Sequence, residues 1–103
     1  GGYILPGLHL MLESLARNTA GLPHAQGAPV EWPRNTDDAI HNGCAGAQAA
    51  LIERVQARLG ADATILLSGG GAEALSPYLA CAHRRVDNLV LRGLARVAAD
   101  VMK

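Results

Sequence analysis

The hydrophobic and polar positions of the first 18 residues predict a short strand followed at once by a helix. Tyr3-Ile4-Leu5 is an apolar run that ends at Pro6-Gly7, a dipeptide typical of turns. Apolar residues then recur at helical spacing as far as about Asn18. The positions that carry this helical pattern are Leu8, Met11, Leu12 and Leu15.

The clearest helical pattern spans residues 36–59. Thr36 stands where an N-cap is expected, Asp37 and Asp38 follow in the first turn, and Gly60 ends the pattern. Glycine and alanine dominate the first half, which suits close internal packing or a subunit interface. The stripe expected to be buried is Ile40, Cys44, Ala47, Leu51, Val55 and Leu59.

A second apolar run, Thr64–Ser68, is followed by three consecutive glycines, Gly69 to Gly71, and then by good helix formers from Ala72 to about Ala80. This order predicts a strand, a glycine turn and a helix that Pro77 breaks or kinks. A glycine turn before a helix lets a flat or charged ligand such as a nucleotide approach the backbone. The segment matches neither the phosphate-loop pattern nor the dinucleotide fingerprint, so a tight connection without a ligand is the alternative.

Residues 89–102 close the chain with an amphipathic helical pattern, whereas glycines and prolines in residues 19–35 predict a long loop that carries Trp32. Arg92, Arg96 and Asp100 fall on the outward side of this last helix. The positions expected to face inward are Leu91, Leu94, Val97, Ala98 and Val101.

Strands that alternate with helices indicate one α/β domain with parallel strands. Two strands make a poor sheet. A third strand would lie in residues 24–34 or 83–91, or a segment upstream of Gly1 would complete the sheet, which is the interpretation we favour.

Composition narrows the classes of partner. Lys plus Arg equals Asp plus Glu at 9 each, which disfavours nucleic acid and anionic membrane as partners. No apolar run approaches the roughly 20 residues of a spanning helix. Cys44 and Cys81 form no metal-ligand motif, and reduced cysteines suit a cytoplasmic protein.

Few residues suggest catalysis by type alone. No Gly-x-Ser-x-Gly motif is present, and the acidic residues Asp37, Asp38 and Glu73 suit helix first turns. Thr36 is the exception, because an N-cap hydroxyl beside free N–H groups can also take a carboxylate or amide oxygen. The histidines, interpreted as surface or capping residues, are His9, His24, His41 and His83.

Five short motifs together resemble, in order and spacing, the C-terminal part of type III pantothenate kinases. They are Gly1-Gly2-Tyr3-Ile4-Leu5-Pro6-Gly7, Thr19-Ala20-Gly21-Leu22-Pro23, Asn35-Thr36-Asp37-Asp38-Ala39-Ile40 with Gly43, Leu67-Ser68-Gly69-Gly70, and Asn88-Leu89-Val90-Leu91-Arg92-Gly93-Leu94. That family belongs with sugar kinases, actin and Hsp70 chaperones, which clasp ATP between two ribonuclease-H-like domains. The resemblance implies an α/β fold in which residues 1–103 are the C-terminal portion of the second, actin-like domain, incomplete, with helices packed on a small sheet.

The resemblance also implies an activity: transfer of the γ-phosphate of ATP to pantothenate, the first step towards coenzyme A. It implies Mg²⁺ on the phosphates, a monovalent cation (K⁺ or NH4⁺) held mostly by residues outside this chain, and a homodimer. By position, Thr36 matches the family threonine that contacts pantothenate, and Asn18 falls where some relatives place a histidine in that site. Ser68, Gly69 and Gly70 match a threonine-glycine-glycine segment that faces the nucleotide.

The family's aspartate-glycine phosphate loop, its glycine-x-aspartate-arginine segment with the catalytic base and its cation-binding aspartate would all lie upstream of Gly1. No catalytic residue is therefore expected in this chain, and the fragment alone is expected to be inactive. The alternative is a non-catalytic regulatory or accessory transcription-factor module of the same family, although the balanced charge argues against direct DNA contact.

Overall fold

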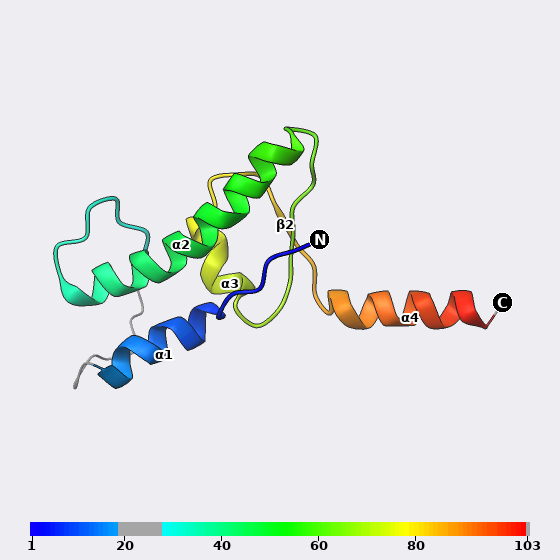
Figure 1. The fold of residues 1–103 in the computed structure, drawn as a ribbon, viewed down its shortest axis with the longest axis horizontal. Helices are drawn as coiled ribbons and strands as arrows, with labels where there is room; N and C mark the ends of the chain where they lie inside the picture. Colours follow the sequence, from blue (N-terminus) through cyan, green and yellow to red (C-terminus); the bar gives the residue numbers. More distant parts are fainter. Residues whose placement is uncertain (19–27, 103) are drawn as a thin grey trace.

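The computed structural model describes residues 1–18 and 28–102, and within them the chain is an α/β structure of four α-helices, one 3₁₀ helix and a small parallel sheet (Figure 1). This confirms the expected class. The elements are α1 (Leu8–Asn18), α2 (Thr36–Leu59), β1 (Leu66–Leu67), α3 (Ala72–Leu75), the 3₁₀ helix η1 (Ser76–Tyr78), β2 (Arg84–Arg85) and α4 (Leu89–Val101).

The long helix α2 has the predicted length but a different cap. Asn35 is extended (φ −131°, ψ 163°), and its side chain accepts a hydrogen bond from the Asp38 N–H. The prediction that Thr36 is the N-cap is therefore wrong by one residue, because Thr36 already belongs to the helix. At the other end, Gly60 (φ +100°) ends the helix as predicted, and its N–H donates to the Gln56 carbonyl at 3.0 Å.

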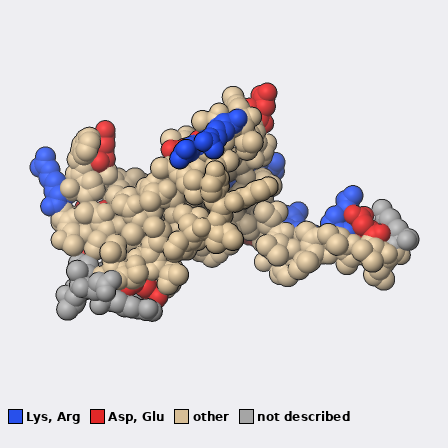
Figure 2. Space-filling model, viewed as in Figure 1, with Lys and Arg blue, Asp and Glu red and all other residues tan. Residues whose placement is uncertain are grey.

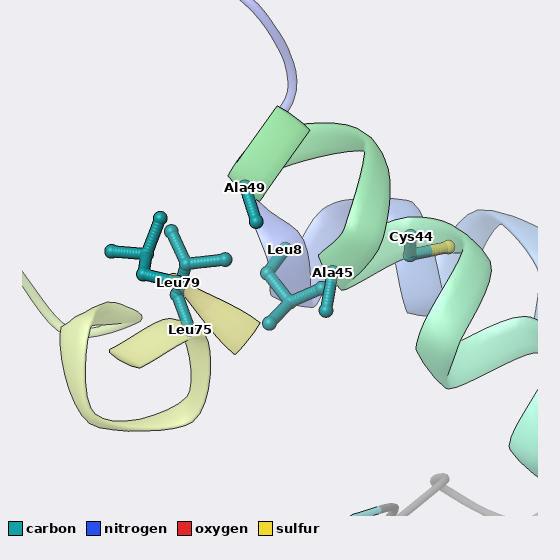
Figure 3. Close-up of a cluster of buried hydrophobic side chains, with 6 residues drawn as sticks. All are labelled: Leu8, Cys44, Ala45, Ala49, Leu75 and Leu79. Atoms are coloured by element: carbon teal, nitrogen blue, oxygen red, sulfur yellow. The ribbon is translucent and has the colours of Figure 1, made fainter. Parts of the chain in front are cut away.

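The core forms where α1, α2 and the α3–η1 segment meet (Figure 3). Ala45 and Ala49 of α2 are buried, so some of the small residues of this helix serve internal packing. The predicted stripe is partly wrong, since Ala47 is exposed and Leu59 is 68% exposed. The buried residues are Leu8, Cys44, Ala45, Ala49, Leu75 and Leu79.

The N-terminal segment is not a strand, contrary to prediction. Ile4 is fully exposed, and residues 1–7 have no strand partner among the described residues. The Pro6 carbonyl instead accepts a hydrogen bond from the Gln48 side chain at 2.7 Å, which ties this segment to α2. A strand needs a neighbour to pair with, and the described part of the chain supplies none here.

The sheet consists of β1 and β2, which pair in parallel with Leu66 opposite Arg84 and Leu67 opposite Arg85. Of the two internal segments considered for an extra strand, residues 83–91 contain β2, whereas the described part of the other, residues 28–34, contains none. β1 is shorter than the predicted Thr64–Ser68. Pro77 has the predicted effect, because α3 ends after one turn and continues only as η1.

Helix α4 has nearly the predicted bounds, but the prediction that its apolar side faces inward is wrong. None of its residues is buried, and Figure 1 shows it projecting away from the other helices. The Cα radius of gyration is accordingly 16.4 Å, whereas a complete domain of this size has about 13 Å. Within the described residues, no helix is long and apolar enough to cross a membrane.

Candidate functional site

Thr36 borders a hollow of about 580 Å³ between the end of α1 and the start of α2. Its side chain is exposed and has no hydrogen-bond partner among the described residues, because Asn35 performs the capping instead. The hydroxyl is thus available to a ligand. The lining residues are Leu15, Pro33, Arg34, Asn35, Thr36, Ala39, Ile40, Gly43 and Cys44.

The charges around this hollow are unevenly distributed. Arg34 is its only basic lining residue in the described chain, and no carboxylate of the described residues lies within ion-pair distance of its guanidinium. The Asp38 carboxylate is turned to the cap, where it accepts a hydrogen bond from the Asn35 amide at 2.8 Å. Arg34 is therefore available to an anion, a feature that the sequence interpretation missed.

The wall opposite α2 comes from the last turns of α1. Leu15 is the residue of α1 that lines the hollow among the described side chains, and Asn18 ends the same helix. The motif Thr19–Pro23 lies outside the described residues. At the side of α2, burial raises the pKa of the Cys44 thiol, which keeps this lining residue neutral.

The three residues predicted to face a nucleotide, Ser68, Gly69 and Gly70, line a separate hollow of about 820 Å³ between the end of β1 and the start of α4. Gly69 has φ +104°, a conformation that side chains rarely adopt, so the chain needs glycine to turn here. The Ser68 hydroxyl accepts a hydrogen bond from the Leu89 N–H at 3.4 Å. Ser68 therefore caps α4 as well as lining the hollow.

A smaller polar hollow of about 140 Å³ lies beside the same glycine turn. Arg85 lines it together with two carboxylates, Glu73 and Asp87. Two acidic residues against one basic residue disfavour a bare phosphate at this position. Across the described residues, no group of three or more His, Cys, Asp or Glu side chains is placed to hold a metal ion.

The hollow beside Thr36 and the hollow beside Ser68 share no lining residue, and in Figure 1 the start of α2 and the start of α4 lie towards opposite ends of the long axis. The two hollows are therefore separate sites in the described part of this chain.

Two histidines form hydrogen bonds within the chain, and for one of them, His41, the predicted surface or capping position is wrong. His41 is buried, and its Nδ1 lies 2.5 Å from the Tyr78 hydroxyl, so it joins α2 to η1. His83 Nδ1 donates to the Cys81 carbonyl, and its Nε2 lies 2.6 Å from the Ser76 hydroxyl. Both histidines hold elements together. The sequence did contain a signal for the burial of His41, because helical spacing places it on the same face as Cys44 and Ala45.

Comparison with known proteins shows which family the chain belongs to. A family model described as type III pantothenate kinase matches residues 1–58. The chain is 52% identical over 99 residues to the type III pantothenate kinase of Dechloromonas aromatica and 53% identical over 102 residues to that of Aromatoleum aromaticum, with 95% and 97% of this chain aligned. It spans only 42% of the length of either relative. The chain belongs to the type III pantothenate kinase family.

Proposed function

We propose that the full-length protein carrying this sequence phosphorylates pantothenate with ATP, the first step of coenzyme A biosynthesis. The observation that carries the proposal is the unpartnered Thr36 side chain at the mouth of a hollow, in a chain about half identical to kinases named for this substrate. The fold proposed with it is the incomplete second domain of a ribonuclease-H-like, actin-like ATPase, of which residues 1–103 are the C-terminal portion.

The Thr36 hollow suits the chemistry of pantothenate, which combines a carboxylate, an amide and an apolar dimethyl group. The Arg34 guanidinium would pair with the carboxylate, and the Thr36 hydroxyl would donate to a carboxylate or amide oxygen. Leu15 and Ile40 offer apolar contact. Asn18, at the end of α1, is proposed as a further contact to pantothenate.

The hollow at Ser68, Gly69 and Gly70 is proposed to take the nucleoside part of ATP. Leu66, Leu89 and Val90 line it with apolar surface, and glycine allows a planar group to approach the backbone. Glu73 and Asp87 next to it disfavour the phosphates. By the family resemblance, Mg²⁺, the monovalent cation, most phosphate contacts and the catalytic base are proposed to belong to polypeptide outside this chain, so the chain alone is proposed to be inactive.

The first test is steady-state kinetics of the full-length protein with Thr36→Ala, with Thr36→Ser as the matched control. We expect Thr36→Ala to raise the KM for pantothenate by roughly tenfold, the equivalent of one charge-assisted hydrogen bond, and to leave the KM for ATP within about twofold. Thr36→Ser keeps the hydroxyl and should restore the pantothenate KM. An unchanged KM in Thr36→Ala would remove Thr36 from the site. If the unmodified full-length protein transfers no phosphate from ATP, the regulatory alternative is favoured.

The proposed protein is a cytoplasmic homodimer in which the outward side of the first half of α2 forms the interface. Gly43, Ala47 and Ala50 on that side are exposed, and a Cβ at Gly46 would meet no atom of the described residues within 4 Å. Gly46→Leu should therefore leave the subunit folded while weakening the dimer. Analytical ultracentrifugation of the full-length protein checks this, and a dimer as tight as the unmodified one would exclude this interface.

A further inference from the structure

We propose that the apolar face of α4 docks onto the part of the full-length polypeptide that lies outside these 103 residues. The apolar face comprises Val90, Leu91, Leu94, Val97, Ala98 and Val101. The partner is thus the same polypeptide, and the contact is intramolecular. The proposal concerns packing and does not depend on the reaction that the protein catalyses.

The two sides of α4 differ sharply in chemistry. Every residue of the apolar face is uncharged, whereas Arg92, Arg96 and Asp100 follow the opposite side, where Arg96 and Asp100 lie 3.6 Å apart one turn from each other. Figure 2 shows the charged residues of the projecting helix along one edge and none along the other. Such a division is typical of a helix with one side in water and the other in a core.

Among the described residues, however, no surface covers the apolar face. Leu94 and Val97 are each 59% exposed and Val101 is 78% exposed. Helices as short as the 13 residues of α4 are marginal in water without tertiary packing. A stable α4 therefore requires a cover over this face.

The length of the relatives supports the choice of the remaining polypeptide as the partner of α4. Both aligned kinases are more than twice as long as the matched segment, since this chain accounts for 42% of each. A tethered segment has a far higher effective concentration than a separate molecule, so the remaining polypeptide is the first partner available to the helix.

The neighbouring sheet points to the same partner. β1 and β2 form a parallel pair with both outer edges unpaired among the described residues, and Leu66 of β1 is 46% exposed. Parallel sheets are normally covered on both faces and extended by further strands. The hollow proposed for the nucleoside is lined by the start of α4 but not by Leu94, Val97 or Val101, so the additional polypeptide would cover these three residues beside that hollow.

The docking also couples α4 to the glycine turn. The first N–H of α4, that of Leu89, donates to the Ser68 hydroxyl, and Asn88 at φ 56° fixes the direction in which the helix leaves. A rigid cover over α4 would therefore hold the wall formed by Leu89, Val90 and Leu91 against Gly69 and Gly70.

Photo-crosslinking of the full-length protein tests the proposal directly. A photoreactive residue at position 97 is compared with one at position 99, which lies on the charged side, in a mixture of isotopically light and heavy protein. We expect position 97 to crosslink to peptides outside residues 1–103 within one polypeptide, at least fivefold more than position 99. Crosslinks between light and heavy chains would show a second copy as the cover and overturn the proposal.

Hydrogen exchange of α4 amides supplies an independent measurement on Val97→Lys, with Ala99→Lys as the matched control. We expect protection of at least a hundredfold in the unmodified full-length protein, a loss of tenfold or more in Val97→Lys and no change in Ala99→Lys. If Val97→Lys does not fold, Val97→Ala should show a smaller loss of the same sign. Exchange as fast as in a free peptide, or protection that arises only with anionic vesicles, would contradict the proposal.

Discussion

Helices α2 and α4 show opposite relations between pattern and burial. The apolar residues of α2 are spread around the helix, yet it supplies Cys44, Ala45 and Ala49 to the core. Helix α4 has a strongly one-sided pattern but buries none of its residues in this chain. A one-sided apolar pattern therefore indicates that a helix needs a covering surface. Burial shows that such a surface is present.

The difference follows from side-chain size and from neighbours. In α2, alanines let Leu8 of α1 and Leu75 of α3 approach, so even a weakly patterned helix becomes central (Figure 3). In α4, large apolar residues need an opposing surface of similar size, and the described chain offers none.

The largest expected difference between the two regions is in stability, measured by comparing Leu8→Ala with Leu94→Ala in the 103-residue chain. Leu8 is 5% exposed, so its truncation should lower the free energy of unfolding by about 2–5 kcal/mol. Leu94→Ala should change it by less than about 0.5 kcal/mol, because its side chain is already in water. Urea unfolding measures both. Equal losses would mean that α4 packs within this chain.

A smaller effect separates capping from ligand binding at the start of α2. Asn35→Ala removes the side chain that accepts from the Asp38 N–H and should cost about 1 kcal/mol of stability. Thr36→Ala should cost less than about 0.5 kcal/mol, since this side chain caps nothing. Thermal unfolding of the full-length variants checks the pair. A larger loss in Thr36→Ala than in Asn35→Ala would restore Thr36 as the cap.

The smallest effect is a pH dependence confined to the packed region. Burial raises the pKa of the Cys44 thiol above its ordinary value of 9.0, and burial followed by the Asp38 carboxylate raises the pKa of Tyr78 above 10.0. For both groups the folded state favours the neutral form. Their contribution to stability is thus complete below pH 9 and is lost as the pH rises through the folded pKa values.

Hydrogen exchange of α2 amides between pH 8 and 11, corrected for the intrinsic rate, measures this loss. Cys44→Ala should flatten the first part of the profile and Tyr78→Phe the second. Cys81→Ala, at a less buried thiol, serves as the control. A Cys44→Ala profile identical to that of the unmodified protein would contradict the assignment.

Local structure follows from the residues adjacent to each element. Helical spacing and Gly60 set α2, Pro77 ended α3, and the glycine run set the turn in which Gly69 has a positive φ. These features depend on backbone conformations that only certain residues favour, so neighbouring residues suffice to predict them. The motif residues Thr36 and Ser68 were likewise found from the sequence, and each lines a hollow.

Which faces are buried and which polar groups lack a partner depends on contacts between residues that are distant in the sequence. Asn35 rather than Thr36 caps α2, His41 is inside, and Tyr3 to Leu5 form no strand. Each of these outcomes depends either on two residues that compete for one role or on a partner distant in the sequence. The spacing of apolar residues contains neither kind of information. For the same reason, the one-sided pattern of α4 predicted an inward-facing side, whereas the described residues of this chain offer no surface that covers it.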